Sequence, residues 1–220
     1  MSRLYVVGTP IGNLEDVSAR ALRILSEVTA IAAEDTRVTA RLLARHGIRK
    51  PLLSYRAPVE RRGLPRVMGA LEEGDVALVS DAGTPTLSDP GAALVNAAWA
   101  AGHTVVPIPG PSAIAAALSI AGHSGPGFTF VGYLPRKPGE IRRLLQSVAG
   151  DERPTVAFES PYRIRKSLAL VDEILPDRAV TLARELTKVH EQVIRGTAAE
   201  IAAALGDKVK GEITLVISGR

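Results

Sequence analysis

A short apolar run that ends in a loop of small and polar residues constrains the fold of this chain most strongly. Val76–Val79 is continuously apolar, which is typical of a strand buried on both faces of a parallel sheet. The next residues read Ser80-Asp-Ala-Gly-Thr-Pro85, in which Gly83 and Pro85 oppose extension of the strand. Open α/β sheets bind ligands in loops at the carboxyl ends of their strands. The loop is therefore either a ligand-binding loop or an ordinary strand-to-helix connection, and the local pattern leaves both open.

The helix that follows this loop is expected over residues 92–101. Asp89 is the residue type that caps helices, and Pro90 would then occupy the first helical position. We therefore expect the helix to begin at this pair.

Apolar runs and amphipathic stretches alternate along the rest of the chain. In the first half we expect strands over 4–7, 29–33, 52–54, 76–79 and 103–108, and helices over 17–26, 38–46, 59–73, 92–101 and from 112. After a stretch rich in glycine and proline (121–127), we expect strands over 128–133, 155–158, 179–183, 190–195 and 212–217, and helices over 138–148, 161–174 and 198–205. This pattern predicts two α/β domains, 1–120 with a mainly parallel sheet and 121–220 with a mixed sheet, and a ligand cleft between them.

Composition excludes several classes of protein. The sequence has no run of about 18 apolar residues and no signal-peptide pattern, so we expect no membrane span and a cytoplasmic protein. Cysteine is absent, which excludes disulfides, thiolate zinc sites and a cysteine nucleophile, and we expect no metal. The net charge of +4 fits an RNA or phosphate partner but does not require one, and charge alone favours an arginine-rich solvated surface.

Two further loops follow apolar runs near the N-terminus. Gly8 and Gly12 stand four apart with Pro10 between them, which is not the spacing of a dinucleotide fingerprint, and no phosphate-binding P-loop is present. Glu34-Asp-Thr-Arg37 places two acids and an arginine after the second apolar run. These residues form either a site or a helix N-terminus that favours negative charge.

Six motifs in order resemble the tetrapyrrole methylase superfamily, in its branch that methylates ribosomal RNA. They are Thr9–Leu14 (TPIGNL), Ala33–Arg37 (AEDTR), Ser80–Pro85 (SDAGTP) with Ser88–Gly91 (SDPG), Pro109–Ser112 (PGPS), Glu159–Pro161 (ESP) and Ala183–Lys188 (ARELTK). The resemblance spans Leu4 to Gly219. Tyr162 and Gln192 depart from the family pattern, which has histidine and glutamate there.

The resemblance implies S-adenosylmethionine as methyl donor and a cytidine 2′-hydroxyl in the decoding region of 16S ribosomal RNA as acceptor. It also implies a homodimer that acts on the small ribosomal subunit. The cofactor-binding residues that it implies are Thr9, Pro10, Ser80, Asp81, Ala82, Gly83, Thr84, Leu87, Ser112, Ala113, Phe158, Glu159 and Leu186.

Candidate catalytic residues lie at and beyond the strand expected over 179–183. Methylation of a 2′-hydroxyl is helped by a base or by a cation that stabilises the oxyanion, and Glu185, Lys188 and His190 are the candidates for these roles. An ordinary surface role remains open for all three.

Candidate RNA-binding residues are the arginines and lysines that occur in clusters, since these contact phosphate. The clusters give Arg37, Arg61, Arg62, Arg136, Lys137, Arg142, Arg143 and Arg163. A cluster is otherwise a solvated helix face. Two other functions stay open, namely methylation of a small tetrapyrrole and a non-catalytic RNA-binding role in ribosome assembly.

Overall fold

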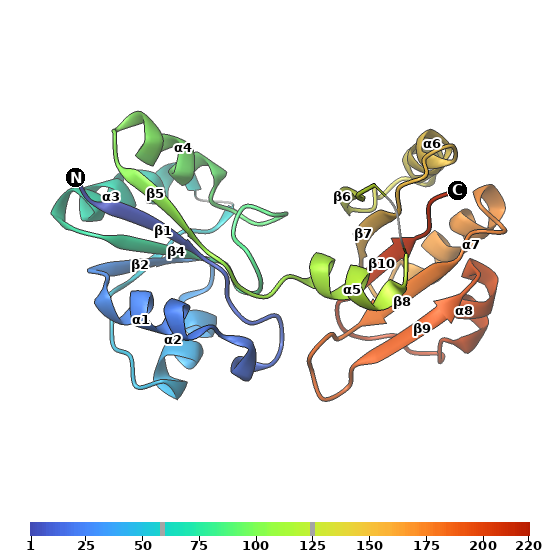
Figure 1. The fold of residues 1–220 in the computed structure, drawn as a ribbon, viewed down its shortest axis with the longest axis horizontal. Coiled ribbons are helices and arrows are strands. Elements are labelled where there is room, and N and C mark those ends of the chain that lie inside the picture. The colour runs from blue at the N-terminus through green and yellow to red at the C-terminus, as the bar shows by residue number, and fades with distance from the viewer. Residues whose placement is uncertain (58–59, 124–125) are drawn as a thin grey trace. The chain divides into compact units, whose positions relative to one another are not determined.

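The computed structural model describes residues 1–57, 60–123 and 126–220, apart from the side chains of residues 60 and 61. The chain forms two compact units, Met1–Ser112 and Ala113–Arg220 (Figure 1). Strands β1 (Arg3–Val7), β2 (Ala30–Ala33), β3 (Leu52–Ser54), β4 (Val76–Val79) and β5 (Thr104–Ile108) build the first unit, with a 3-10 turn at Leu14–Asp16 and helices α1 (Ala19–Glu27), α2 (Thr36–Arg45), α3 (Glu60–Glu73) and α4 (Ala92–Ala100).

The sheet of the first unit is wholly parallel, in the order β3-β2-β4-β1-β5. Residues of β1 alternate between two cores. Tyr5 and Val7 pack with α1 and α2, whereas Leu4 packs with α3 and α4. Because both faces are covered, β2 and β4 are buried at every position, which is why they read as continuous apolar runs.

The second unit carries a mixed sheet in the order β6-β7-β10-β8-β9. Its strands are β6 (Thr129–Tyr133), β7 (Thr155–Glu159), β8 (Val180–Arg184), β9 (Gln192–Gly196) and β10 (Ile213–Ile217). Only β6 and β7 pair in parallel, and the other pairs are antiparallel. Its helices are α5 (Ala113–Ala121), α6 (Pro138–Val148), α7 (Ile164–Ile174) and α8 (Ala198–Ala204). Helices α6, α7 and α8 share one apolar core with the sheet, and α5 contacts β8 and β10.

The expected α/β architecture is confirmed, with one parallel and one mixed sheet. The contacts of α5 place that helix in the second unit, so the units divide at Ser112 rather than in the glycine-rich stretch 121–127. Residues 124 and 125 of that stretch, and residue 59 at the expected start of α3, lie outside the described residues.

Two expected helix starts are wrong. Gly91, not Asp89, is the N-cap of α4, and Pro90 lies before the helix. Gly91 has a φ of 132°, a backbone conformation that residues with a side chain rarely adopt, and a Cβ there would lie 2.7 Å from the Leu78 side chain. Helix α7 begins at Ile164 because residues 161–163 form a turn. No helix in the described part of the chain has the length and apolar composition needed to cross a bilayer.

Candidate active site

Three loops meet at the carboxyl edge of the parallel sheet, after the neighbouring strands β4, β1 and β5. Thr9 and Gly83 form an isolated bridge, in which each backbone N–H donates to the other's carbonyl, at 2.8 and 3.0 Å. The Thr9 hydroxyl adds a bond to the Ser80 carbonyl at 3.2 Å. The loops after β1 and β4 are therefore fixed to one another. We call the set 8–13, 80–87 and 109–112 the three-loop edge.

Glycines allow the third loop to approach the first. A Cβ on Gly110 would lie 2.6 Å from the Gly8 carbonyl oxygen, and a Cβ on Gly8 would lie 2.8 Å from the Gly110 Cα. A real Cβ atom essentially never lies this close to a backbone atom, so both positions exclude a side chain. The carbonyl oxygen of Pro111 also reaches Gly83, at 3.7 Å from a Cβ built there.

The loop after β4 holds an unusual backbone. Gly83, Thr86 and Ser88 have φ values of 79°, 75° and 67°. Left-handed conformations are uncommon outside glycine and persist where surrounding structure imposes them, often at ligand sites. Within the described residues, the backbone N–H groups of Ala82 and Thr84 donate to no acceptor. The loop therefore presents two donors that a ligand with acceptor atoms can use.

The predicted cofactor-binding residues divide between the two units. Thr9, Pro10, Ser80 and Gly83 are buried in the three-loop edge, Ala82, Thr84 and Ser112 are half-buried, and Asp81 and Leu87 are exposed. Ala113 is the first residue of α5, and Phe158, Glu159 and Leu186 belong to the second unit. Their assignment to the cofactor stays a prediction.

The carboxylate of Glu159 is buried and bonded to neighbouring side chains and backbone of the second unit. Its side chain is 0% exposed, and its carboxylate accepts from the Ser167 hydroxyl at 2.6 Å and from the Ser160 backbone N–H, and pairs with Arg163 at 2.7 Å. Arg163 also donates to the carbonyls of Leu134 and Pro135. These bonds occupy both side chains within the second unit, which leaves Arg163 little capacity to bind RNA phosphate.

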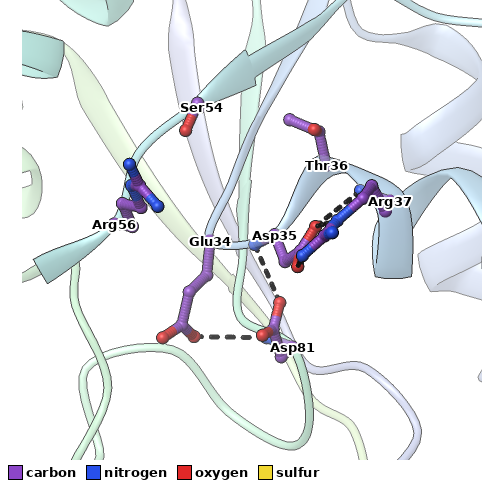
Figure 2. Close-up of a pocket in the computed structure, with 7 residues that line it drawn as sticks. All are labelled: Glu34, Asp35, Thr36, Arg37, Ser54, Arg56 and Asp81. Atoms are coloured by element: carbon purple, nitrogen blue, oxygen red, sulfur yellow. Dashed lines mark hydrogen bonds and ion pairs between the residues drawn. The ribbon is translucent and has the colours of Figure 1, made fainter.

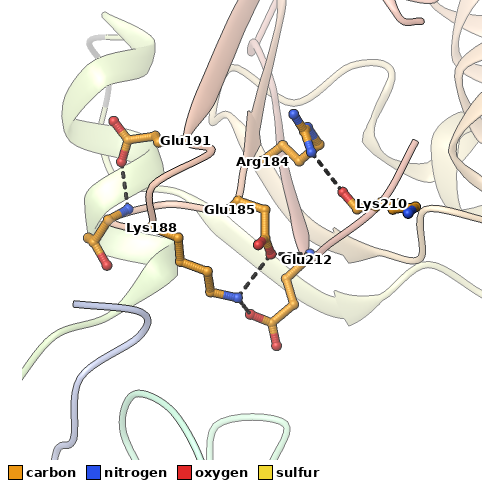
Figure 3. A network of polar contacts seen from close by, with 7 residues as sticks. Arg184, Glu185, Lys188, Glu191, Lys210 and Glu212 are labelled. Atoms are coloured by element: carbon orange, nitrogen blue, oxygen red, sulfur yellow. Dashed lines mark hydrogen bonds and ion pairs between the residues drawn. The ribbon is translucent and has the colours of Figure 1, made fainter. Parts of the chain in front are cut away.

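The predicted catalytic residues Glu185 and Lys188 form a network with Glu212 (Figure 3). The Lys188 ammonium lies 2.9 Å from the Glu185 carboxylate and 2.8 Å from that of Glu212. Glu185 also accepts from the Glu212 backbone N–H at 3.0 Å. His190 is exposed and lies before β9, and Gln192 accepts from the Arg184 guanidinium at 3.0 Å.

The contacts in this network favour the charged forms of Glu185 and Lys188. Burial lowers the pKa of Lys188, but hydrogen bonds to the carboxylates of Glu212 and Glu185 outweigh it and raise the pKa above the ordinary lysine value. Burial raises the pKa of Glu185, but the Glu212 backbone N–H and Lys188 outweigh it and hold the pKa below the ordinary value. Lys188 is therefore a stable cation and Glu185 a weak base.

A second feature of the first unit is a pocket of about 530 Å³ after β2, β3 and β4 (Figure 2). It is lined by Glu34, Asp35, Thr36, Arg37, Ser54, Arg56 and Asp81. Asp35 is the N-cap of α2, so the interpretation of residues 34–37 as a helix N-terminus is confirmed. The same residues also line the pocket, so their interpretation as a binding site stays open. Ser54 and Arg56 were not among the expected site residues, because only the sheet order brings β3 beside β2.

The predicted RNA-binding residues differ in how free their charges are. Arg142 forms a two-bond pair with Glu173, at 3.1 and 2.7 Å, and Arg37 pairs likewise with Asp35. Lys137 makes one exposed 3.5 Å contact with Glu140, and Arg143 donates to a backbone carbonyl. Arg62 and Arg136 are exposed and make no ion pair within the described residues, whereas the side chain of Arg61 lies outside them.

Two solved structures share this fold. The methyltransferase CobJ superposes with a TM-score of 0.71 at 21% identity, covering 100% of this chain and 95% of that chain. Diphthine synthase superposes with a TM-score of 0.71 at 16% identity, covering 99% and 90%. The family model of the tetrapyrrole (corrin/porphyrin) methylases matches residues 3–202. Fold and motifs together define a methylase of this class.

Two relatives with known names show which group of the family this chain resembles in sequence. Ribosomal RNA small subunit methyltransferase I of Thermotoga maritima is 46% identical over a 222-residue alignment that covers 100% of both chains. The protein of that name from Neisseria meningitidis serogroup B is 48% identical, over 97% of this chain and 75% of its own length. The chain belongs to the tetrapyrrole methylase family, in its group of small subunit ribosomal RNA methyltransferases, and the resemblance seen in the six motifs is confirmed.

Proposed function

We propose that this protein methylates the 2′-hydroxyl of a cytidine ribose in the decoding region of 16S ribosomal RNA, with S-adenosylmethionine as donor. The observation that carries the proposal is the three-loop edge, built from family motifs in a chain 46% identical over its full length to a small subunit ribosomal RNA methyltransferase. We further propose that the enzyme is a cytoplasmic homodimer.

The three-loop edge suits the methyl donor. The N–H groups of Ala82 and Thr84, which have no acceptor in the described part of the chain, would bind acceptor atoms of its amino-acid or ribose parts. Leu87, 46% exposed, offers apolar surface to the adenine. When bound, S-adenosylmethionine supplies an electrophilic methyl group on a positively charged sulfur. Thr9 and Ser80 act indirectly, since their buried contacts hold the loops in place.

Lys188 suits the acceptor side of the reaction as a cation rather than as a base. The 2′-hydroxyl is almost fully protonated at neutral pH, and its oxygen becomes negative as the proton leaves. A fixed ammonium stabilises that developing charge. Glu185 and Glu212 position the ammonium, and their carboxylates keep it protonated. The exposed imidazole of His190 is the candidate that would accept the proton.

Transfer of labelled methyl groups tests the proposal. Small ribosomal subunits from a strain that lacks this protein are incubated with the enzyme and S-adenosylmethionine carrying a tritiated methyl group, and the modified nucleotide is mapped. We expect one 2′-O-methylcytidine in the decoding region. Donor binding without transfer to RNA would contradict the proposal and favour a tetrapyrrole acceptor. Absence of donor binding would instead favour a non-catalytic role in ribosome assembly.

A further inference from the structure

The pocket beside the three-loop edge combines opposite charges in one cavity (Figure 2). Glu34 follows β2, Ser54 ends β3 and Arg56 lies just beyond it, and Asp81 follows β4. All of these residues lie at the carboxyl ends of parallel strands, where α/β sheets place their ligands. At about 530 Å³ the pocket lies within the usual range of small-molecule sites.

Two charged side chains of this pocket, Glu34 and Arg56, make few or no hydrogen bonds or ion pairs within the described residues. The Glu34 carboxylate has one contact among the described residues, a 3.4 Å bond from the Asp81 backbone N–H to Oε2, so Oε1 accepts nothing. Arg56 makes no ion pair or hydrogen bond within the described residues. By contrast, Asp35 is fully engaged by Arg37, and Asp81 accepts from the Asp35 backbone N–H at 2.8 Å.

The partly buried carboxylate of Glu34 would be stabilised by a hydrogen-bond donor. Burial raises the pKa of Glu34, the Asp81 backbone N–H opposes this, and the negative charges of Asp81, Asp89 and Asp35 raise it further. A carboxylate that is poorly hydrated in this way gains from an N–H donor brought by a ligand. Arg56 offers a guanidinium suited to a phosphate.

These features together resemble a nucleotide site rather than a metal site. Among the residues that the structure describes, no three acidic or histidine side chains are arranged to hold a metal ion. A cytosine carries an exocyclic amine, which donates to carboxylates, and its nucleotide carries a phosphate. Asp81 belongs both to this pocket and to the proposed donor loop, so a base in the pocket would lie next to the methyl donor.

We propose that this pocket holds the base of the target cytidine, with Glu34 accepting a hydrogen bond from the cytosine N4 amine and Arg56 binding a flanking phosphate. This assignment rests on the proposed function and specifies how that site selects its substrate. Uracil places a carbonyl oxygen where cytosine has the amine, and this oxygen would face the Glu34 carboxylate. The pocket therefore selects cytidine over uridine.

The experiment compares small ribosomal subunits that carry either cytidine or uridine at the methylated position. We expect the wild-type enzyme to transfer methyl groups to the cytidine form at least ~10-fold faster. Glu34→Gln supplies both an amide N–H and a carbonyl, so it should accept either base and reduce the ratio to ~2-fold or less. Glu73→Gln, the same change on the exposed end of α3, should keep the wild-type ratio. Calorimetry should show unchanged donor affinity in both variants.

Arg56→Gln provides the second arm. It should weaken binding of both subunits equally and lower the salt dependence of binding, because a phosphate contact carries no base information. If Glu34→Gln is too slow to assay, the affinities of the two subunits are compared in the presence of S-adenosylhomocysteine. A Glu34→Gln ratio equal to the wild-type ratio, or a wild-type enzyme that does not discriminate, would overturn the base assignment while leaving methyl transfer itself intact. Failure of transfer to both subunits would overturn the proposed function instead.

Discussion

The substitution Glu159→Ala tests whether this carboxylate holds the second unit together. Glu159 ends β7, whereas Arg163 caps α7 and Ser167 lies within it, so the carboxylate links a strand to the helix that covers it. The links are the 2.7 Å pair with Arg163 and the 2.6 Å bond from the Ser167 hydroxyl. Removing the carboxylate leaves both partners without their acceptor.

The structure gives the size of the effect. Breaking a buried ion pair by removing one partner costs about 3–5 kcal/mol. Arg163 is 28% exposed and regains some water, so the low end, about 3 kcal/mol, applies. Ser167 is 1% exposed, and leaving its hydroxyl without an acceptor adds about 1 kcal/mol. We expect Glu159→Ala to lower the free energy of unfolding of the second unit by about 4 kcal/mol.

Urea unfolding followed by far-ultraviolet circular dichroism measures this loss, and hydrogen exchange of the α7 amides locates it. Glu173→Ala is the matched control, because Glu173 lies on the same helix in an exposed pair with Arg142, which is worth about 1 kcal/mol or less. A Glu159→Ala variant within 1 kcal/mol of wild type would refute the reasoning. If that variant also lost donor binding, the carboxylate would serve the cofactor rather than the fold.

Three further substitutions test the site. Gly83→Val should abolish donor binding measured by calorimetry while the protein stays folded, because valine opposes a φ of 79°, and retained affinity would contradict the placement of the donor. Lys188→Gln should lower kcat by about 10²-fold with little change in KM. In the wild-type enzyme the pKa of Lys188 is raised above the ordinary lysine value of 10.5, so the rate should not fall through loss of this cation until the pH is more alkaline than that. A fall at lower pH that is caused by deprotonation of Lys188 would argue against this role. Arg136→Ala with Lys137→Ala should weaken binding to ribosomal subunits and reduce its salt dependence, whereas Arg142→Ala, which breaks a pair with Glu173, should change the salt slope less. Equal slopes would move the RNA surface elsewhere.

Much of the fold could be predicted because local pattern and tertiary environment agree. Val76–Val79 is apolar at each position and is buried at each position between two helical layers. Ser18 caps α1 by accepting from the Ala21 backbone N–H, as its residue type indicates. At Asp89 the local sequence pattern and the tertiary environment disagree. A good capping residue stands there, but Gly91, with a φ of 132°, is the N-cap of the helix.

The site was only partly predictable, because sequence motifs do not show which charges neutralise one another. Arg142, Arg163 and Arg165 look alike in the sequence, yet one pairs with Glu173, one with Glu159, and Arg165 donates to carbonyls at the end of α8. Arg56 stands alone in the sequence, and only the pairing of β3 with β2 brings it to Glu34. Long-range pairing of this kind leaves no local signal.

Backbone strain connects the two stretches proposed to perform the chemistry. Within the described residues, Thr86, Ser88, Glu185 and Thr187 are the non-glycine residues with positive φ. Such conformations cost about 1–3 kcal/mol each and survive only where other contacts impose them. Near Glu185 those contacts are visible, since its side chain lies so close to Gly211 that a Cβ there would collide with it, and the Glu212 backbone N–H donates to its carboxylate. Thr86 lies in the proposed donor loop with Ser88 just after it, and Glu185 pairs with the proposed catalytic lysine, so the strain is located where the proposed methyl transfer would need fixed geometry.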